Sequence, residues 1–137
     1  MKIISGGQTG VDRGALDAAL ELGLECGGTC PAGRKAEDGM IPEKYSLTEF
    51  DSTVYSDRTR QNVVDSDATL IIHFGQLEGG TAFTRRCCIE ENRPYLVIDV
   101  SEDDESLQVH QIQDFVRESS IQVLNVAGPR AGEGPGA

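Results

Sequence analysis

The apolar residues of this chain fall into short continuous runs that alternate with segments of helical periodicity. The clearest run, ATLIIHF at residues 68–74, is largely apolar without alternation, as in a strand buried on both faces of a sheet. From Val11 to Leu22 the apolar residues recur three and four positions apart, which predicts a helix, and Gly23 is a typical residue to end it. The same reasoning predicts strands at residues 2–5, 25–30, 52–56, 68–74, 95–100 and 121–127. It predicts helices at residues 11–22, 57–64, 81–92 and 106–119.

This alternation of strands and helices is typical of an α/β fold with an open, mainly parallel sheet. The 137 residues are the usual size of a single domain, and no internal repeat divides them. Residues 31–50 contain two prolines and two glycines, so we expect an irregular excursion there. Residues 128–137 carry no large apolar side chain, and we expect them to form a loose tail.

Composition excludes several classes of function. The net charge of −11 makes nucleic acid and anionic membranes poor partners, and the absence of Trp argues against a stacking platform for single strands. No apolar stretch approaches the ~20 residues of a membrane span, and the opening MKII is too short for a signal peptide. The cysteines form no CxxC pair, so we expect free thiols in a reducing cytoplasm and no metal ligated by the protein. They are Cys26, Cys30, Cys87 and Cys88.

A glycine-rich turn connects the first predicted strand directly to the first predicted helix. It comprises Gly6, Gly7, Gln8, Thr9 and Gly10. The N–H groups at a helix start have no partner within the helix, and the helix dipole is positive there, so such a turn favours an anion, most naturally a phosphate. The glycine spacing matches neither the dinucleotide GxGxxG pattern nor the Walker loop.

A second turn of this kind, formed by Gly79, Gly80 and Thr81, follows the strand at 68–74. Ligands of open α/β sheets bind outside the carboxyl ends of the strands. If the two strands are neighbours, the two turns flank one crevice and share one ligand. We therefore expect a common ligand site.

The few basic residues near these turns could reach over that crevice. Arg34 lies in the irregular excursion, and Arg58 and Asn62 are four positions apart, hence on one face of a helix. Each arginine could equally be an ordinary surface charge, which is the favoured interpretation for Lys35, Arg85 and Arg86.

Candidate catalytic groups are few. Asp12 could stabilise the dipole of the first helix or could face the ligand as an acceptor. Together with Glu37 and Asp38 it could supply a base, and no pattern selects one of the three. We expect His73 to be a core residue and His110 to be exposed, and the chain carries no GxSxG or HExxH motif.

The chain resembles the molybdenum cofactor carrier family in five segments that occur in the same order and cover nearly its whole length. These segments are SGGQTGVDRGALDAAL, CPAGRKAEDGMIPEKY, RTRQNVVDSDATLI, GGT and LNVAGPR. The resemblance implies a Rossmann-like three-layer sandwich, related to the LOG (lysine decarboxylase-like) proteins and assembled as a homo-oligomer. It implies that the protein binds and protects molybdenum cofactor (molybdopterin), a pterin with a dithiolene and a terminal phosphate. The residues implied to bind it are Gly6, Gly7, Gln8, Thr9, Gly10, Arg34, Arg58, Asn62, Gly79, Gly80 and Thr81.

The related LOG enzymes cleave nucleoside monophosphates and carry a catalytic glutamate in the pattern PGGxGTxxE. At the second turn of this chain the glutamate position is occupied by Arg86 or Thr84, depending on which glycines are aligned. Neither can replace a carboxylate, so we expect binding without turnover. Two alternatives remain: a LOG-like phosphoribohydrolase that uses another carboxylate such as Asp12 or Asp38, and a nucleotide-sensing module.

Overall fold

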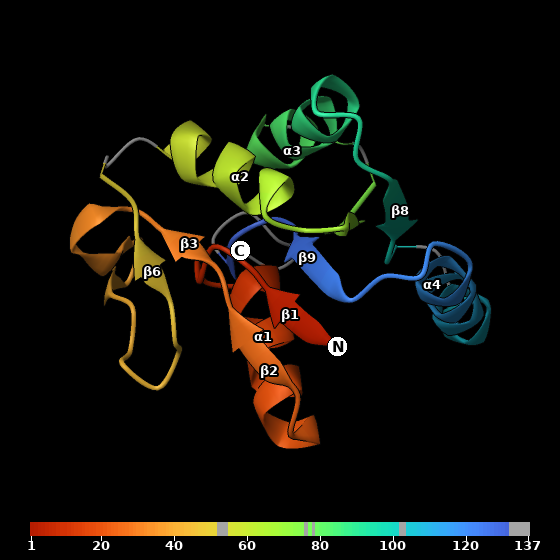
Figure 1. Cartoon of the computed structure of the whole chain (residues 1–137), viewed down its shortest axis with the longest axis horizontal. Coiled ribbons are helices and arrows are strands. Elements are labelled where there is room, and N and C mark those ends of the chain that lie inside the picture. Colours follow the sequence, from red (N-terminus) through yellow and green to blue (C-terminus); the bar gives the residue numbers. More distant parts are fainter. Residues whose placement is uncertain (52–54, 76, 78, 102–103, 132–137) are drawn as a thin grey trace.

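The computed structural model of this chain describes residues 1–51, 55–75, 77, 79–101 and 104–131 (Figure 1). The central sheet contains β1 (Lys2–Ile4), β2 (Glu25–Gly27), β7 (Ala68–His73), β8 (Tyr95–Asp99) and β9 (Val123–Ala127). The α-helices of these residues are α1 (Val11–Leu22), α2 (Tyr55–Val64), α3 (Gly79–Glu90) and α4 (Glu105–Glu118). Shorter elements lie between β2 and α2: β3 (Thr29–Cys30), the 3-10 turn η1 (Ala32–Arg34), β4 (Lys35–Ala36), β5 (Gly39–Met40) and β6 (Thr48–Glu49).

The sheet has the strand order β2-β1-β9-β7-β8, and every pairing in it is parallel. The expected α/β fold with an open parallel sheet is therefore confirmed. β9 lies between β1 and β7: Ile3 is aligned with Leu124, and Ile71 with Ala127. The middle of the sheet is thus filled by a strand more than a hundred residues away from β1 in the chain.

Helices cover both faces of the sheet, which gives the expected three-layer sandwich (Figure 1). On one face, Ala19 of α1 and Phe115 of α4 pack with strand residues such as Ile3 in one hydrophobic cluster. On the other face, Val63 of α2 packs with Cys87 of α3. The alternating side chains of the buried strands therefore contact a different pair of helices on each side.

The single strand expected at residues 25–30 is divided by Gly28. β2 pairs with β1, whereas β3 turns away and pairs with β6. Gly28 has φ 125°, and a Cβ on it would lie 2.0 Å from the carbonyl oxygen of Ser5. Only glycine lets the chain leave the sheet so close to the end of β1.

A strand was expected at residues 52–56, but Tyr55 and Ser56 are the first two residues of α2. Residues 52–54 lie outside the described residues. The excursion at 31–50 contains a small antiparallel hairpin, β4–β5. α3 begins at Gly79, two residues before its expected start, so both glycines of the second turn lie in its first turn.

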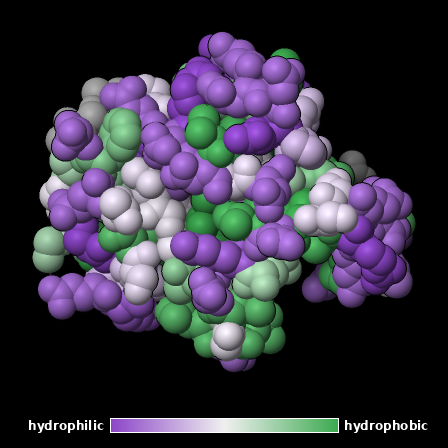
Figure 2. All heavy atoms as spheres, in the orientation of Figure 1, coloured by the Kyte–Doolittle hydropathy of each residue, from purple (hydrophilic) through white to green (hydrophobic). Residues whose placement is uncertain are grey.

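Hydrophilic side chains cover most of the face in Figure 2, with a few hydrophobic patches between them. This distribution agrees with the net charge of −11. Within the part of the chain that the structure describes, every helix is too short or too polar to cross a bilayer.

Candidate functional site

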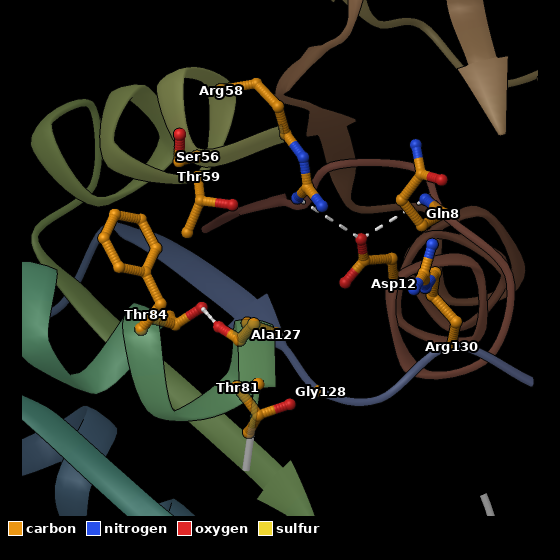
Figure 3. A pocket seen from close by; sticks show the side chains of 13 residues that line it. Gln8, Asp12, Ser56, Arg58, Thr59, Thr81, Thr84, Ala127, Gly128 and Arg130 are labelled. Atoms are coloured by element: carbon orange, nitrogen blue, oxygen red, sulfur yellow. Dashed lines mark hydrogen bonds and ion pairs between the residues drawn. The ribbon is translucent and has the colours of Figure 1, made fainter. Parts of the chain in front are cut away.

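A cavity of about 400 Å³ lies beyond the carboxyl ends of β1 and β9, between the starts of α1 and α3. This is the end of the sheet at which α/β proteins bind their ligands. Its wall contains residues from both glycine turns, from α2, and from the segment that follows β9 (Figure 3). The lining residues are Gln8, Asp12, Ser56, Arg58, Thr59, Gly79, Gly80, Thr81, Phe83, Thr84, Ala127, Gly128 and Arg130.

The two glycine turns line this one cavity although their strands are not neighbours. A shared crevice was expected on the condition that β1 and β7 are neighbours; this condition is not met, because β9 lies between them. The carboxyl end of β9, at Ala127 and Gly128, forms the wall between the turns. A Cβ on Gly128 would lie 2.4 Å from the carbonyl oxygen of Ile72, so glycine is needed for the chain to pass between the two turns.

Some backbone donors of the first turn and of the start of α1 are already used inside the protein. The Gln8 N–H donates to the Asp12 carboxylate (3.2 Å), and the Val11 N–H donates to the Pro129 carbonyl (3.4 Å). The Gln8 side chain is almost fully buried, and its Nε2 donates to the Lys35 carbonyl (2.9 Å). Its Oε1 has no hydrogen-bond partner among the described residues. Both nitrogen atoms of Gln8, the residue of this turn that lines the cavity, therefore donate within the protein, whereas the sequence suggested donors for the ligand.

Asp12 places a buried carboxylate in the cavity wall. It lies in the first turn of α1 and is 3% exposed. Its Oδ2 is 3.7 Å from Nη1 of Arg58 (Figure 3). Burial raises the pKa of Asp12 to about 6, against the opposing effects of the Arg58 charge and the Gln8 N–H. Asp12 thus both caps the turn and faces the cavity, and its pKa lies in the range of groups that transfer protons near neutral pH.

Arg58 extends from α2 across the backbone of the first turn (Figure 3). A Cβ on Gly6 would lie 2.0 Å from Nη1 of Arg58 and 2.7 Å from its Cζ. Gly6 does not have a positive φ. A side chain at this position would displace the guanidinium, which packs directly on the Cα of Gly6, and this contact couples the first turn to α2.

The start of α3 supplies the donors that the first turn does not. The first N–H groups of any α-helix have no acceptor within the helix, and the positive end of the dipole lies there. Gly79, Gly80 and Thr81 form this start and line the cavity. Arg58 and Arg130 line the same cavity. Among the described residues of the lining, the charged side chains are these two arginines and Asp12, so positive charge prevails there although the whole chain has a net charge of −11.

Arg130 belongs to a segment that the sequence assigned to a loose tail. Residues 128–131 instead cross the start of α1: the Ala131 N–H donates to Oγ1 of Thr9 (3.2 Å), and the Thr9 hydroxyl donates to Glu37. A Cβ on Gly10 would lie 2.6 Å from the Pro129 carbonyl oxygen. The turn thus holds this segment in place. Residues 132–137 lie outside the described residues.

Two of the expected ligand-binding side chains have their polar atoms occupied elsewhere. Nη2 of Arg34 donates to the carbonyls of Pro42 (2.8 Å) and Tyr45 (2.9 Å) and fixes the excursion. The Asn62 amide accepts from the N–H of Thr29 (2.8 Å) and donates to its carbonyl (2.9 Å), which joins α2 to β3. Neither residue lines the cavity of about 400 Å³.

Several lining residues were not singled out by the sequence argument. They are Ser56, Thr59, Phe83, Thr84, Ala127, Gly128 and Arg130. One signal was present: the segment LNVAGPR places Arg130 three residues beyond the end of β9. For Ser56, Thr59 and Phe83 the sequence gives no sign, because their helices approach each other only in the folded chain.

The pKa of Asp12 leads to a test by pH. The stability of the wild-type chain relative to an Asp12→Asn variant is expected to fall between pH 4 and about 6, by on the order of 3 kcal/mol. Below this window Asp12 is protonated in both states. Between pH 4 and about 6, Asp12 ionises only in the unfolded chain, which favours unfolding. Above about pH 6 it is ionised in both states, and the difference in stability between wild type and variant stays constant. Urea denaturation of both proteins at a series of pH values measures the effect, and a difference independent of pH would contradict it.

The described residues contain no group of three or more His, Cys, Asp or Glu side chains arranged to hold a metal ion. Cys30, Cys87 and Cys88 are buried, and burial raises the pKa of each thiol. These thiols therefore stay protonated and pack as small apolar side chains.

Comparisons with known proteins agree with this architecture. A model of the family "Circularly permutated YpsA SLOG family" matches residues 3–137. A crystal structure described as "Putative molybdenum carrier protein", from Syntrophus aciditrophicus SB, is 48% identical with a TM-score of 0.95; the match covers 98% of this chain and 85% of that one. Comparison with curated proteins gives no match. The family match spans nearly the whole chain, and the chain belongs to the circularly permuted YpsA SLOG family.

Proposed function

We propose that this protein binds a phosphorylated small molecule, either molybdenum cofactor or a related phosphorylated pterin or nucleotide, and carries it without turnover. The observation that supports this proposal is the cavity at which the start of α3, Arg58 and Arg130 converge. The similar structure from Syntrophus aciditrophicus is described as a molybdenum carrier protein, which favours the pterin.

The phosphate is the part of the ligand that this cavity suits best. In a chain with a net charge of −11, an anion binds only where local donors outweigh the overall field. The helix start at Gly79–Thr81 offers backbone N–H groups, and the guanidinium groups of Arg58 and Arg130 offer charge-assisted hydrogen bonds. The volume of about 400 Å³ is that of a small-molecule site.

The second glycine turn favours holding a ligand over cleaving it. Thr84 and Arg86 occupy the positions at which a LOG enzyme would carry its glutamate. The Thr84 hydroxyl donates to the Gly80 carbonyl (2.9 Å), and Arg86 is exposed. We also propose a cytoplasmic homo-oligomer, as the resemblance implies, which light scattering of the purified protein would test.

A binding experiment under anaerobic conditions tests the carrier function. Purified protein mixed with molybdenum cofactor is expected to retain the cofactor through gel filtration and to slow its oxidation. Serum albumin at the same concentration is the control for non-specific protection. If the protein neither retains the cofactor nor slows its oxidation, this choice of ligand is wrong. Mass spectrometry of small molecules that co-purify anaerobically would then identify the ligand.

A second function is favoured by one observation, the buried Asp12 carboxylate in the cavity wall. With a pKa of about 6 it could act as the acid or base of a nucleoside monophosphate phosphoribohydrolase. Asp38, the other carboxylate considered, is held by Arg13 (2.5 and 2.8 Å), which lowers its pKa, and it lies outside the cavity. Release of free base from nucleoside monophosphates by the wild type, lost in Asp12→Asn, would establish this activity in place of simple carriage.

A further inference from the structure

A second cavity, of about 430 Å³, adjoins the first one between α2, α3 and the end of the excursion. Its lining includes Phe50, just after β6, and Val64 at the end of α2. Ser56 and Phe83 line both cavities. The two cavities therefore share part of their walls.

The chemistry of the two walls is different. The first cavity contains the charged groups Asp12, Arg58 and Arg130 together with the start of α3. The second contains two phenylalanines and a valine, and its charged groups are the guanidinium of Arg60 and the carboxylate of Asp57. A phosphate suits the first wall and a flat apolar or heteroaromatic group suits the second.

The Phe83 ring lies in contact with two arginine side chains, one of which, Arg60, also lines the second cavity. The Cζ atoms of Arg60 and Arg86 each lie 5.8 Å from the centroid of the Phe83 ring. Arg60 is held in place by Glu90 (3.3 Å) and Glu91 (3.1 Å), on the last turn of α3 and just beyond it. A planar guanidinium fixed beside a half-buried phenyl ring presents a preformed surface for a flat ring with little loss of side-chain freedom.

We propose that this second cavity is the subsite for a planar heteroaromatic ring, whose phosphate reaches the first cavity past Phe83. The inference rests on the proposed function and narrows it. The ligand is a pterin or purine carrying a phosphate, and sugar phosphates without a heteroaromatic ring bind only through the first cavity. Phe83 and Arg60 contact the heteroaromatic ring of a pterin or purine. Arg58 and Arg130 bind the phosphate, which sugar phosphates also carry.

Titration calorimetry with three probes tests this assignment: hydroxymethylpterin monophosphate, guanosine monophosphate and ribose phosphate. At least one of the two heteroaromatic probes is expected to bind the wild type about tenfold more tightly than ribose phosphate. Stacking of a base on an aromatic side chain contributes a free energy of this size. In Phe83→Leu the ratio of the two affinities is expected to fall to about one, whatever the change in ribose phosphate affinity itself. Phe115→Leu, at a half-buried phenylalanine of α4 outside both cavities, is the matched control.

A second variant keeps the test decisive if Phe83→Leu unfolds. Arg60→Gln alters a partly exposed side chain and is expected to weaken the binding of the heteroaromatic probe several-fold, without effect on ribose phosphate. Equal affinity of the wild type for the heteroaromatic probes and ribose phosphate would overturn the ring subsite and leave the phosphate site standing. Equal weakening of all probes by both variants would also overturn it, because that result indicates a structural role. Failure of the wild type to bind any probe would overturn the proposed function as well.

Discussion

Replacing Arg58 with methionine is expected to weaken the binding of a phosphorylated pterin or nucleotide by about a hundredfold. The guanidinium lies on Gly6 and 3.7 Å from Asp12, so its loss removes a cation from the cavity wall and leaves the carboxylate facing the ligand phosphate. The pKa of Asp12 should rise further, because the Arg58 charge is the main effect that lowers it. Titration calorimetry with hydroxymethylpterin monophosphate measures the affinity. Arg117→Met, at an exposed arginine in the last turn of α4, is the matched control.

Gly6→Ala offers an independent route to the same result. The new methyl group would overlap the Arg58 guanidinium, which is the end of a flexible side chain and can move away. The fold should therefore persist while the cation leaves its place. A loss of affinity below about threefold in both variants would show that Arg58 does not contact the phosphate.

Gly28→Ala is expected to reduce the free energy of unfolding by about 3 kcal/mol or more. The added Cβ would lie 2.0 Å from the Ser5 carbonyl oxygen, and φ of 125° is unfavourable for any residue with a side chain. Neither backbone can move freely, because the Ser5 N–H donates to the Gly27 carbonyl (3.1 Å). Urea denaturation followed by circular dichroism measures the loss.

Gly14→Ala is the matched control for this substitution. Gly14 lies inside α1 with open space where its Cβ would be, so alanine should raise stability by roughly 0.5–1 kcal/mol. Equal stability of the two variants would contradict the assignment of Gly28 as the residue that separates β2 from β3.

The hydrophobic pattern was enough to predict β1, β7, β8 and β9, because parallel strands buried on both faces read as continuous apolar runs. β2 is not such a run, and the strand expected there extended to residue 30. It could not predict that β9 separates β1 from β7. A run such as residues 121–127 shows that a strand is buried, and nothing in it shows which strands flank it. The same limit applies to Gly28, whose need for a positive φ depends on the position of Ser5 in the folded chain.

The site was predictable in position and less so in detail. The strand-turn-helix pattern located both glycine turns, since such turns lie at the carboxyl ends of parallel strands. In the sequence, Arg34 and Asn62 could not be distinguished from polar residues that line the cavity. Only the folded chain shows that their hydrogen bonds go to the backbone of the excursion and of β3. The sequence could not assign Asp12 a single role. The same carboxylate accepts a hydrogen bond from the first turn and lies beside Arg58 in the cavity wall.

The position of β9 also bears on how the protein is made. While the chain leaves the ribosome, β1, β7 and β8 are synthesised well before residues 123–127 exist, so the middle of the sheet stays empty. Pairing between segments so distant in sequence is slow, because the entropy of closing the long loop is lost before any contact forms. During that interval the edges of β1 and β7 are open to strands of other nascent chains. Chaperone binding to the nascent protein should therefore persist until β9 has emerged.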